Sequence, residues 1–216
     1  MSNTYRFKTE RGRIAMTQAA SRRLFEYWMR LKGQRAAPDR SEIEPADIGP
    51  ILRDTFILER ADDEAMRYRL AGTRLCGLSG SELRGEDWLD GWNRADREAL
   101  VTMFRTMARE AAAAVMLVAA ANERGQQIRL ETLVLPLANR EQGLSRIIGT
   151  TVALDQPYWL GSQALVTRAI SDLQLIWPDE LDRVSDLDAD AVARAATPQP
   201  IRWRGHLAVY DGGLGF

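Results

Sequence analysis

The spacing of apolar residues changes along the chain and separates helical from extended segments. Near the N-terminus, apolar residues recur at intervals of three and four: Ala20, Leu24, Tyr27, Trp28 and Leu31. This spacing predicts an amphipathic helix that buries one face. Gly33 follows the helix and suits the C-cap position, where a left-handed backbone is common. The proline-containing stretch over 34–50 then predicts a linker.

After the linker the pattern becomes that of strands. Residues 55–60 and 66–71 lie on either side of a polar turn, and the second run alternates, which together predict a β-hairpin. In this second run, alternation places Tyr68 and Leu70 on one face of the strand and the neighbouring arginines on the other.

A glycine-punctuated segment over 72–91 precedes a longer helix and three further strands. Residues 94–110 return to helical spacing, and Asn93 or Asp96 is placed to cap this helix. Three antiparallel strands are predicted next, and they are centred on 115–118, 128–137 and 146–154. Residues 160–173 are expected to form a strand end and a short helix.

These elements indicate an α+β fold, in which a five-stranded antiparallel sheet has helices on one face and an additional N-terminal helix. A cavity between sheet and helices is a common kind of ligand site. Three regions are expected: a basic N-terminal helix and linker over 1–50, a core domain over 51–156, and an acidic, partly disordered C-terminal extension over 157–216.

Charge is distributed unevenly, although the 216-residue chain has a formal net charge of only −1. The first 35 residues contain nine basic and two acidic residues, whereas residues 172–190 contain seven acidic residues and one arginine. Opposite charge favours attraction between the two ends, within or between chains, and two separately solvated ends are the alternative. The near-neutral total gives no support for binding of the whole chain to nucleic acid.

The small number of some residue types excludes several kinds of site. The chain has one cysteine, one histidine and two lysines, so it lacks the ligands of a Cys/His zinc site, the HExxH motif and the P-loop lysine. We expect no metal site and no intramolecular disulfide. The longest uncharged apolar run spans 111–121, well short of the roughly 20 residues of a membrane span. No secretory signal is visible, so a cytoplasmic protein is expected.

The segment over 70–85 resembles a PAS domain. In that family a strand leads into a short helix and then into a turn, which here is Gly80-Ser81-Glu82-Leu83-Arg84-Gly85. Residues 128–154, with Leu135-Pro136-Leu137 and Gly149, resemble the last two PAS strands. Three further features are similar to those of the alphaproteobacterial single-PAS family: Tyr27-Trp28, Asp47-Ile48 and Leu70-Ala71-Gly72-Thr73.

The resemblance, which covers about residues 20–156, implies a bacterial, non-catalytic sensory or interaction module. PAS domains bind small ligands or partner domains, commonly dimerise through an N-terminal helix, and usually regulate a kinase, cyclase or transcription factor. Because the chain has no room for such an output domain, we expect it to act in trans on a signalling protein, such as a histidine kinase, and to form a homodimer.

The single histidine and cysteine bear on the cofactor that the resemblance implies. Haem-binding PAS domains usually supply a histidine from a core helix, whereas His206 lies beyond the last predicted strand. Flavin-adduct PAS domains need a cysteine in an Asn-Cys-Arg-type motif after the short helices, whereas Cys76 precedes the Gly80–Gly85 turn. Haem and covalent flavin are therefore disfavoured, the cofactor is left unknown, and Cys76 is expected to be a small buried apolar residue.

The sequence leaves open whether a non-covalent ligand binds in the expected cavity. Trp88 and Trp92 would share a face only if their stretch were helical, and Gly91 argues against a helix. Ordinary core packing would equally explain the candidate wall residues, which are Tyr68, Leu70, Trp88, Trp92, Phe104, Leu117, Leu133 and Ile148.

Two other functions are left open. One is a small α+β enzyme that uses the sheet–helix cavity with Tyr68 or with carboxylates such as Glu82 and Glu86. The other is a nucleic-acid or membrane-surface binder led by the basic helix. A PAS module predicts an apolar cavity, an enzyme predicts converging polar groups with perturbed titration, and a nucleic-acid binder predicts steep salt dependence.

Overall fold

The computed structural model describes residues 16–62, 65–139 and 143–177, together with the backbone of 202–204 and 207–209. The chain divides into two units, Met1–Pro178 and Asp179–Phe216, and each is described by itself.

The second unit contains a short antiparallel pair, β7 (Arg202–Arg204) and β8 (Leu207–Val209). His206, most of the acidic segment and the disorder expected within the C-terminal extension lie outside the described residues.

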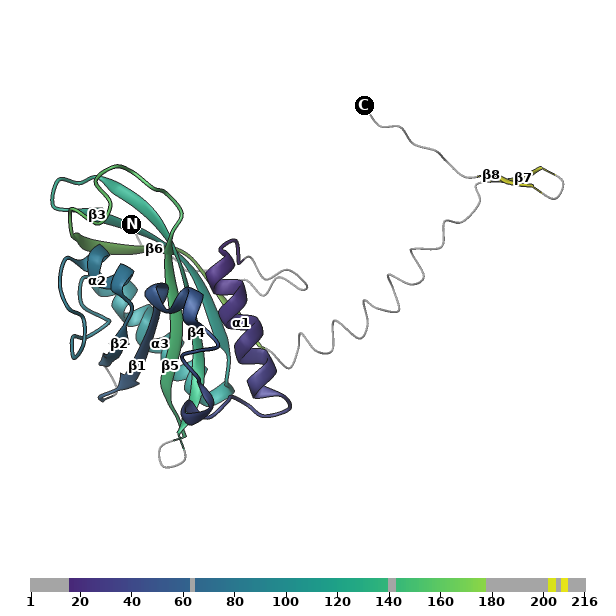
Figure 1. Ribbon diagram of the computed structural model, residues 1–216, viewed down its shortest axis with the longest axis horizontal. Coiled ribbons are helices and arrows are strands. Elements are labelled where there is room, and N and C mark those ends of the chain that lie inside the picture. Colours follow the sequence, from purple (N-terminus) through teal and green to yellow (C-terminus); the bar gives the residue numbers. More distant parts are fainter. Residues whose placement is uncertain (1–15, 63–64, 140–142, 178–201, 205–206, 210–216) are drawn as a thin grey trace. The chain divides into compact units, whose positions relative to one another are not determined.

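The first unit is built on a six-stranded antiparallel sheet with the strand order β2-β1-β5-β4-β3-β6 (Figure 1). Its strands are β1 (Thr55–Arg60), β2 (Met66–Ala71), β3 (Ala113–Asn122), β4 (Gln127–Asn139), β5 (Gly143–Ala153) and β6 (Leu165–Ile176). The predicted α+β fold is confirmed, and the predicted β-hairpin is the pair β1–β2.

The sheet has one strand more than the five predicted, because β6 forms where a strand end and a short helix were expected. β6 pairs along its length with β3. Two shifts in this pairing interrupt the register, so the buried residues of β6 are unevenly spaced: Leu165, Ile170, Leu173, Leu175 and Ile176. Uneven spacing hides the two-residue period from which a strand is predicted.

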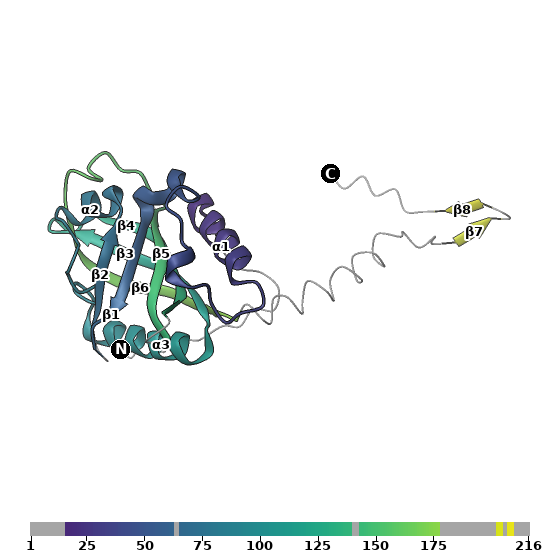
Figure 2. The same ribbon diagram turned by 60° about the horizontal axis from the view of Figure 1, so that its bottom comes forward.

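Helices cover the sheet on both sides (Figure 2). α2 (Thr73–Ser79) and α3 (Arg94–Glu110) contribute to the large core on one face, and α1 (Ala19–Lys32) packs on β4 and β5 from the other. Two short 3₁₀ segments, η1 (Arg40–Glu42) and η2 (Gly49–Asp54), connect α1 to β1.

The two long helices form as their sequences predict. In α1, Leu24, Tyr27 and Trp28 are buried, and Gly33 ends the helix with a positive φ of 53°. In α3, the Asn93 side chain accepts a hydrogen bond from the Asp96 backbone N–H at 3.0 Å, which satisfies one of the free donors of the first turn.

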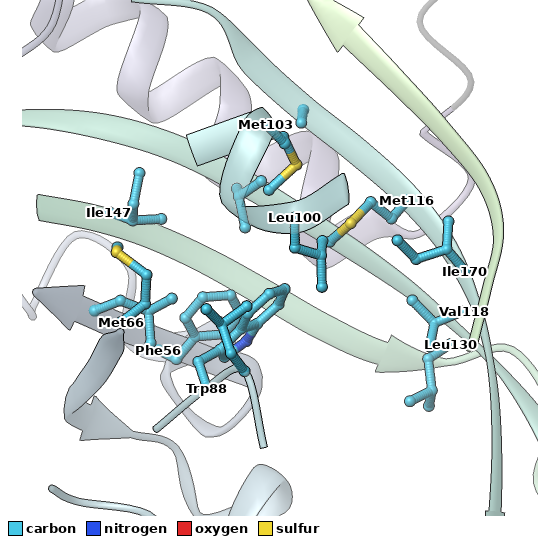
Figure 3. Packing of buried hydrophobic residues seen from close by; sticks show 14 of the residues in the cluster. Phe56, Met66, Trp88, Leu100, Met103, Met116, Val118, Leu130, Ile147 and Ile170 are labelled. Atoms are coloured by element: carbon cyan, nitrogen blue, oxygen red, sulfur yellow. The ribbon is translucent and has the colours of Figure 1, made fainter. Parts of the chain in front are cut away.

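The core between the sheet and α2 and α3 is continuous. Figure 3 shows part of it, with Phe56, Trp88 and Met116 among the buried side chains. A Cβ atom on Gly149 would collide with the Phe56 ring and with the Leu133 carbonyl oxygen. Close packing at this point of β5 therefore requires glycine.

Candidate functional site

A small cavity of about 40 Å³ lies within the core, beside α2. Its apolar wall comes from α2, the following turn and three strands: Leu75, Leu78, Leu83, Val118, Leu130 and Leu165. One ordered water needs roughly 10–15 Å³ on this measure, and pockets for drug-sized ligands hold about 300–1,000 Å³. The cavity therefore suits a very small guest.

Tyr68, Trp88 and Trp92 form the aromatic part of the wall. The indole centroids of Trp88 and Trp92 lie 5.5 Å apart, and Trp92 Nε1 donates to the Trp88 carbonyl at 3.1 Å. This stretch consists of turns, with Gly91 at a φ of 79°. The turns bring the two rings together without the helix that sequence spacing required.

Four polar side chains complete the lining: Ser79, Thr132, Thr151 and Arg168. The hydroxyls of Thr132 and Thr151 lie 3.0 Å apart across β4 and β5. The Arg168 side chain also lines the cavity, close enough to the Tyr68 hydroxyl for its charge to act on it. Burial raises the pKa of the Tyr68 phenol, and the Arg168 charge partly opposes this rise.

Three of the eight predicted wall residues, Tyr68, Trp88 and Trp92, meet at this cavity. Phe104 is buried with its ring 5.4 Å from that of Trp88, but it does not line the cavity. Leu70 is on the other face because the register between β1 and β2 shifts, so that Tyr68 lies opposite Leu58 and Leu70 opposite Ile57. The expected common face of Tyr68 and Leu70 is therefore wrong, and Leu70 is 39% exposed.

Leu117, Leu133 and Ile148 also lie on the sheet face opposite the cavity, because side chains alternate along a strand. In β4, the cavity-facing neighbour of Leu133 is Thr132. Residues 133–137 are apolar at every position, because helices cover both faces of the sheet. Such a run does not reveal whether its odd-numbered or its even-numbered residues face the cavity.

Sequence reasoning missed the polar part of the lining. Alternation from Leu130 would have placed Thr132 on the same face of β4. For Arg168 no local pattern was available, because it lies in the irregular strand β6 and meets Tyr68 only in the folded chain.

Of the acid–base candidates named from the sequence, the cavity lining contains Tyr68. None of the described residues that line it is Asp, Glu, His or Cys. Glu82 and Glu86 are exposed, and Cys76 is half-buried rather than fully buried. Within the described part of the chain, no cluster of three His, Cys, Asp or Glu residues is placed to hold a metal ion, and no helix is long and apolar enough to cross a membrane.

Hydrogen bonds attach α1 to the sheet face opposite the cavity. The buried Glu131 carboxylate accepts hydrogen bonds from the backbone N–H groups of Thr17 at 2.7 Å and Gln18 at 3.1 Å, just before α1 begins. Trp28 Nε1 donates to the Pro136 carbonyl at 2.8 Å. Glu131 is the direct neighbour of Thr132, so one strand contacts both the cavity and the helix.

The outward face of α1 is exposed and mainly basic. It carries Arg22, Arg23, Glu26 and Arg30, which border an open surface groove. Arg22 Nη1 donates to the Thr17 carbonyl at 2.6 Å, and the Arg30 guanidinium lies 5.3 Å from the centre of the Tyr27 ring. Arg23 has no such contact within the described part of the chain.

Comparisons with known proteins agree with this architecture. The model of a PAS domain family matches residues 16–152, which is more than half of the chain. No curated protein matches the chain.

Solved structures with a similar fold include several light-oxygen-voltage (LOV) domains. One, described with a flavin analogue, is 12% identical with a TM-score of 0.39, and the match covers 52% of this chain and 85% of that one. The blue-light photoreceptor Aureochrome1 LOV is 10% identical with a TM-score of 0.39, over 51% and 82% of the two chains. A Rhodobacter sphaeroides LOV protein is 11% identical with a TM-score of 0.38, over 48% and 60%.

Proposed function

The chain belongs to the PAS domain family, and from this premise we propose that it is a non-catalytic sensory and interaction module that regulates a signalling protein in trans. The partner class is a histidine kinase or a component of a transcriptional pathway in the bacterial cytoplasm. A small ligand in the core cavity is the input, and α1 is the output surface.

The observation that carries the proposal is that β4 and β5 have the cavity on one face and α1 on the other. Thr132 and Thr151 line the cavity. Their neighbours contact the helix: Glu131 accepts a hydrogen bond from the Thr17 N–H just before α1, and the Thr150 hydroxyl is hydrogen-bonded to that of Ser21 in α1. A shift of these strands on ligand binding would reach α1 through adjacent residues. Two states of α1 would then differ in their affinity for the partner.

The absence of carboxylate, histidine and thiol groups from the described cavity lining supports a binding role over a catalytic one. A lone phenol with a raised pKa is a poor general base near neutral pH.

The exposed arginines of α1 are the proposed contact surface for a homodimer and for the signalling partner. Arg23→Glu should weaken binding of the signalling partner, because it reverses a charge on this exposed face. Arg105→Glu is the matched control, since Arg105 is also an exposed helical arginine, on α3.

The test is affinity capture of the tagged full chain from its native cells, followed by mass spectrometry, with the dimer measured by light scattering. The expected result is enrichment of a kinase or transcriptional regulator with the wild type and Arg105→Glu, and its loss with Arg23→Glu. Capture of metabolic enzymes alone, or capture unaffected by Arg23→Glu, would overturn the proposal.

A further inference from the structure

We propose that the cavity binds a short-chain aliphatic monocarboxylate, whose carboxylate contacts Arg168 and Tyr68 and whose alkyl end packs against Trp88 and Trp92. The inference rests on the proposed function, because it names the ligand class for the same cavity.

Arg168 is the charged side chain of the described cavity lining. It is partly buried and lines the cavity together with Tyr68, and its charge acts on the Tyr68 phenol. No ion pair joins Arg168 to an acidic side chain among the residues that the structure describes. A guanidinium has five donors arranged to bind a carboxylate through two parallel hydrogen bonds, so this site favours an anionic ligand.

The position of Arg168 is set before any ligand arrives. Its backbone N–H donates to the Gly91 carbonyl at 3.0 Å, which places β6 beside Trp92 through a bridge. Two residues further on, the Ile170 N–H donates to the buried Asp96 carboxylate at 2.9 Å. Two anchors on β6 therefore hold the guanidinium against the aromatic wall, and such preorganisation lowers the entropic cost of binding.

The rest of the lining limits the ligand to a small apolar body. The volume is about 40 Å³, and the Thr132 and Thr151 hydroxyls already contact each other at 3.0 Å. No acidic side chain of the described lining is present to pair with an ammonium group. Amino acids should therefore be rejected, because their ammonium group would lose its hydration without a partner.

The test is a titration of the full chain with butyrate, butyramide and 2-aminobutyrate at constant ionic strength, followed by the indole N–H signals in NMR spectra. Butyrate should bind saturably and shift the signals of Trp88 and Trp92. Butyramide and 2-aminobutyrate should bind at least about tenfold more weakly, since they lack the anion or carry an unpaired cation.

Arg168→Gln should weaken butyrate binding at least about tenfold and leave butyramide binding unchanged. Arg84→Gln is the matched control, since Arg84 is exposed near the cavity-lining Leu83 and does not line the cavity. Equal affinity for butyrate and butyramide, or full butyrate affinity in a folded Arg168→Gln variant, would overturn the ligand class. If Arg168→Gln does not fold, unchanged affinity in both Arg168→Lys and Tyr68→Phe overturns it instead.

The ligand class and the proposed function can fail separately. Partner capture that depends on Arg23, together with no butyrate binding, would overturn the ligand class and leave the signalling function standing. Butyrate binding without capture of any signalling partner would overturn the signalling function and leave the ligand class standing.

Discussion

At the scale of single residues, Gly149 is a point where the packing of the sheet admits no side chain. Gly149→Ala should lower the free energy of unfolding by about 1–3 kcal/mol, because the new methyl group would overlap the Phe56 ring and the Leu133 carbonyl. Urea denaturation measures this change.

Gly77 provides the contrasting glycine substitution. It lies within α2, and a Cβ atom there would meet nothing within 4 Å, so Gly77→Ala should be neutral or stabilise by up to about 1 kcal/mol. Equal effects of the two substitutions would contradict the assigned packing.

Asp155 supplies a pH-dependent contact at the same scale. Arg129 binds its carboxylate through side chain and backbone and lowers the pKa of Asp155 to about 2. An acid with a lowered pKa in the folded state stabilises it above the unfolded value of about 3.9, and this contribution is lost as the pH falls towards 2. Asp155→Asn should therefore lower the urea midpoint slightly at pH 7 and leave it unchanged near pH 2.

The control for Asp155 is Glu123→Gln, which removes an exposed carboxylate from the turn after β3. It should change the urea midpoint at pH 7 very little, because exposed surface substitutions usually alter stability by less than about 0.5 kcal/mol. A pH-independent effect of Asp155→Asn would show that its contact with Arg129 is not electrostatic.

At the scale of elements, the attachment of α1 depends on the buried indole of Trp28. Trp28→Phe keeps most of the apolar contact but leaves the Pro136 carbonyl without its 2.8 Å hydrogen bond. We expect a loss of about 1–3 kcal/mol of stability and faster amide exchange throughout α1, measured by hydrogen–deuterium exchange.

Arg23→Gln on the exposed face of the same helix is the control for Trp28→Phe. Its effect on stability should stay within about 0.5 kcal/mol. Unchanged exchange in α1 of the Trp28→Phe variant would mean that the hydrogen bond to Pro136 does not hold the helix.

At the scale of the whole molecule, β6 makes the fold longer than the core domain of 51–156 expected from the sequence. It buries five large apolar side chains, Leu165, Ile170, Leu173, Leu175 and Ile176. At roughly 1.5–3 kcal/mol each, they contribute about as much as the whole net stability of a small domain. A chain that ends at residue 156 should lack a cooperative unfolding transition, whereas a chain that ends at Pro178 should keep one.

Calorimetry of the two shortened chains measures this difference. Identical transitions for both would place β6 outside the cooperative unit.

The sequence by itself determined the elements whose signal is local. The face of α1, the Asn93 cap of α3 and the β1–β2 hairpin follow from spacings of two to four residues, and such spacings act before any distant contact forms. Trp88, Trp92 and Tyr68 were also identified from local composition, and they meet at the cavity.

Only the tertiary structure decided which side chains share the cavity. A register shift turns Leu70 to the other face, and the uniformly apolar run in β4 conceals that Thr132, rather than Leu133, faces inward. Arg168 reaches Tyr68, a hundred positions earlier in the chain, because β6 is held beside Trp92. These outcomes depend on pairing and close packing between distant segments, which local periodicity does not encode.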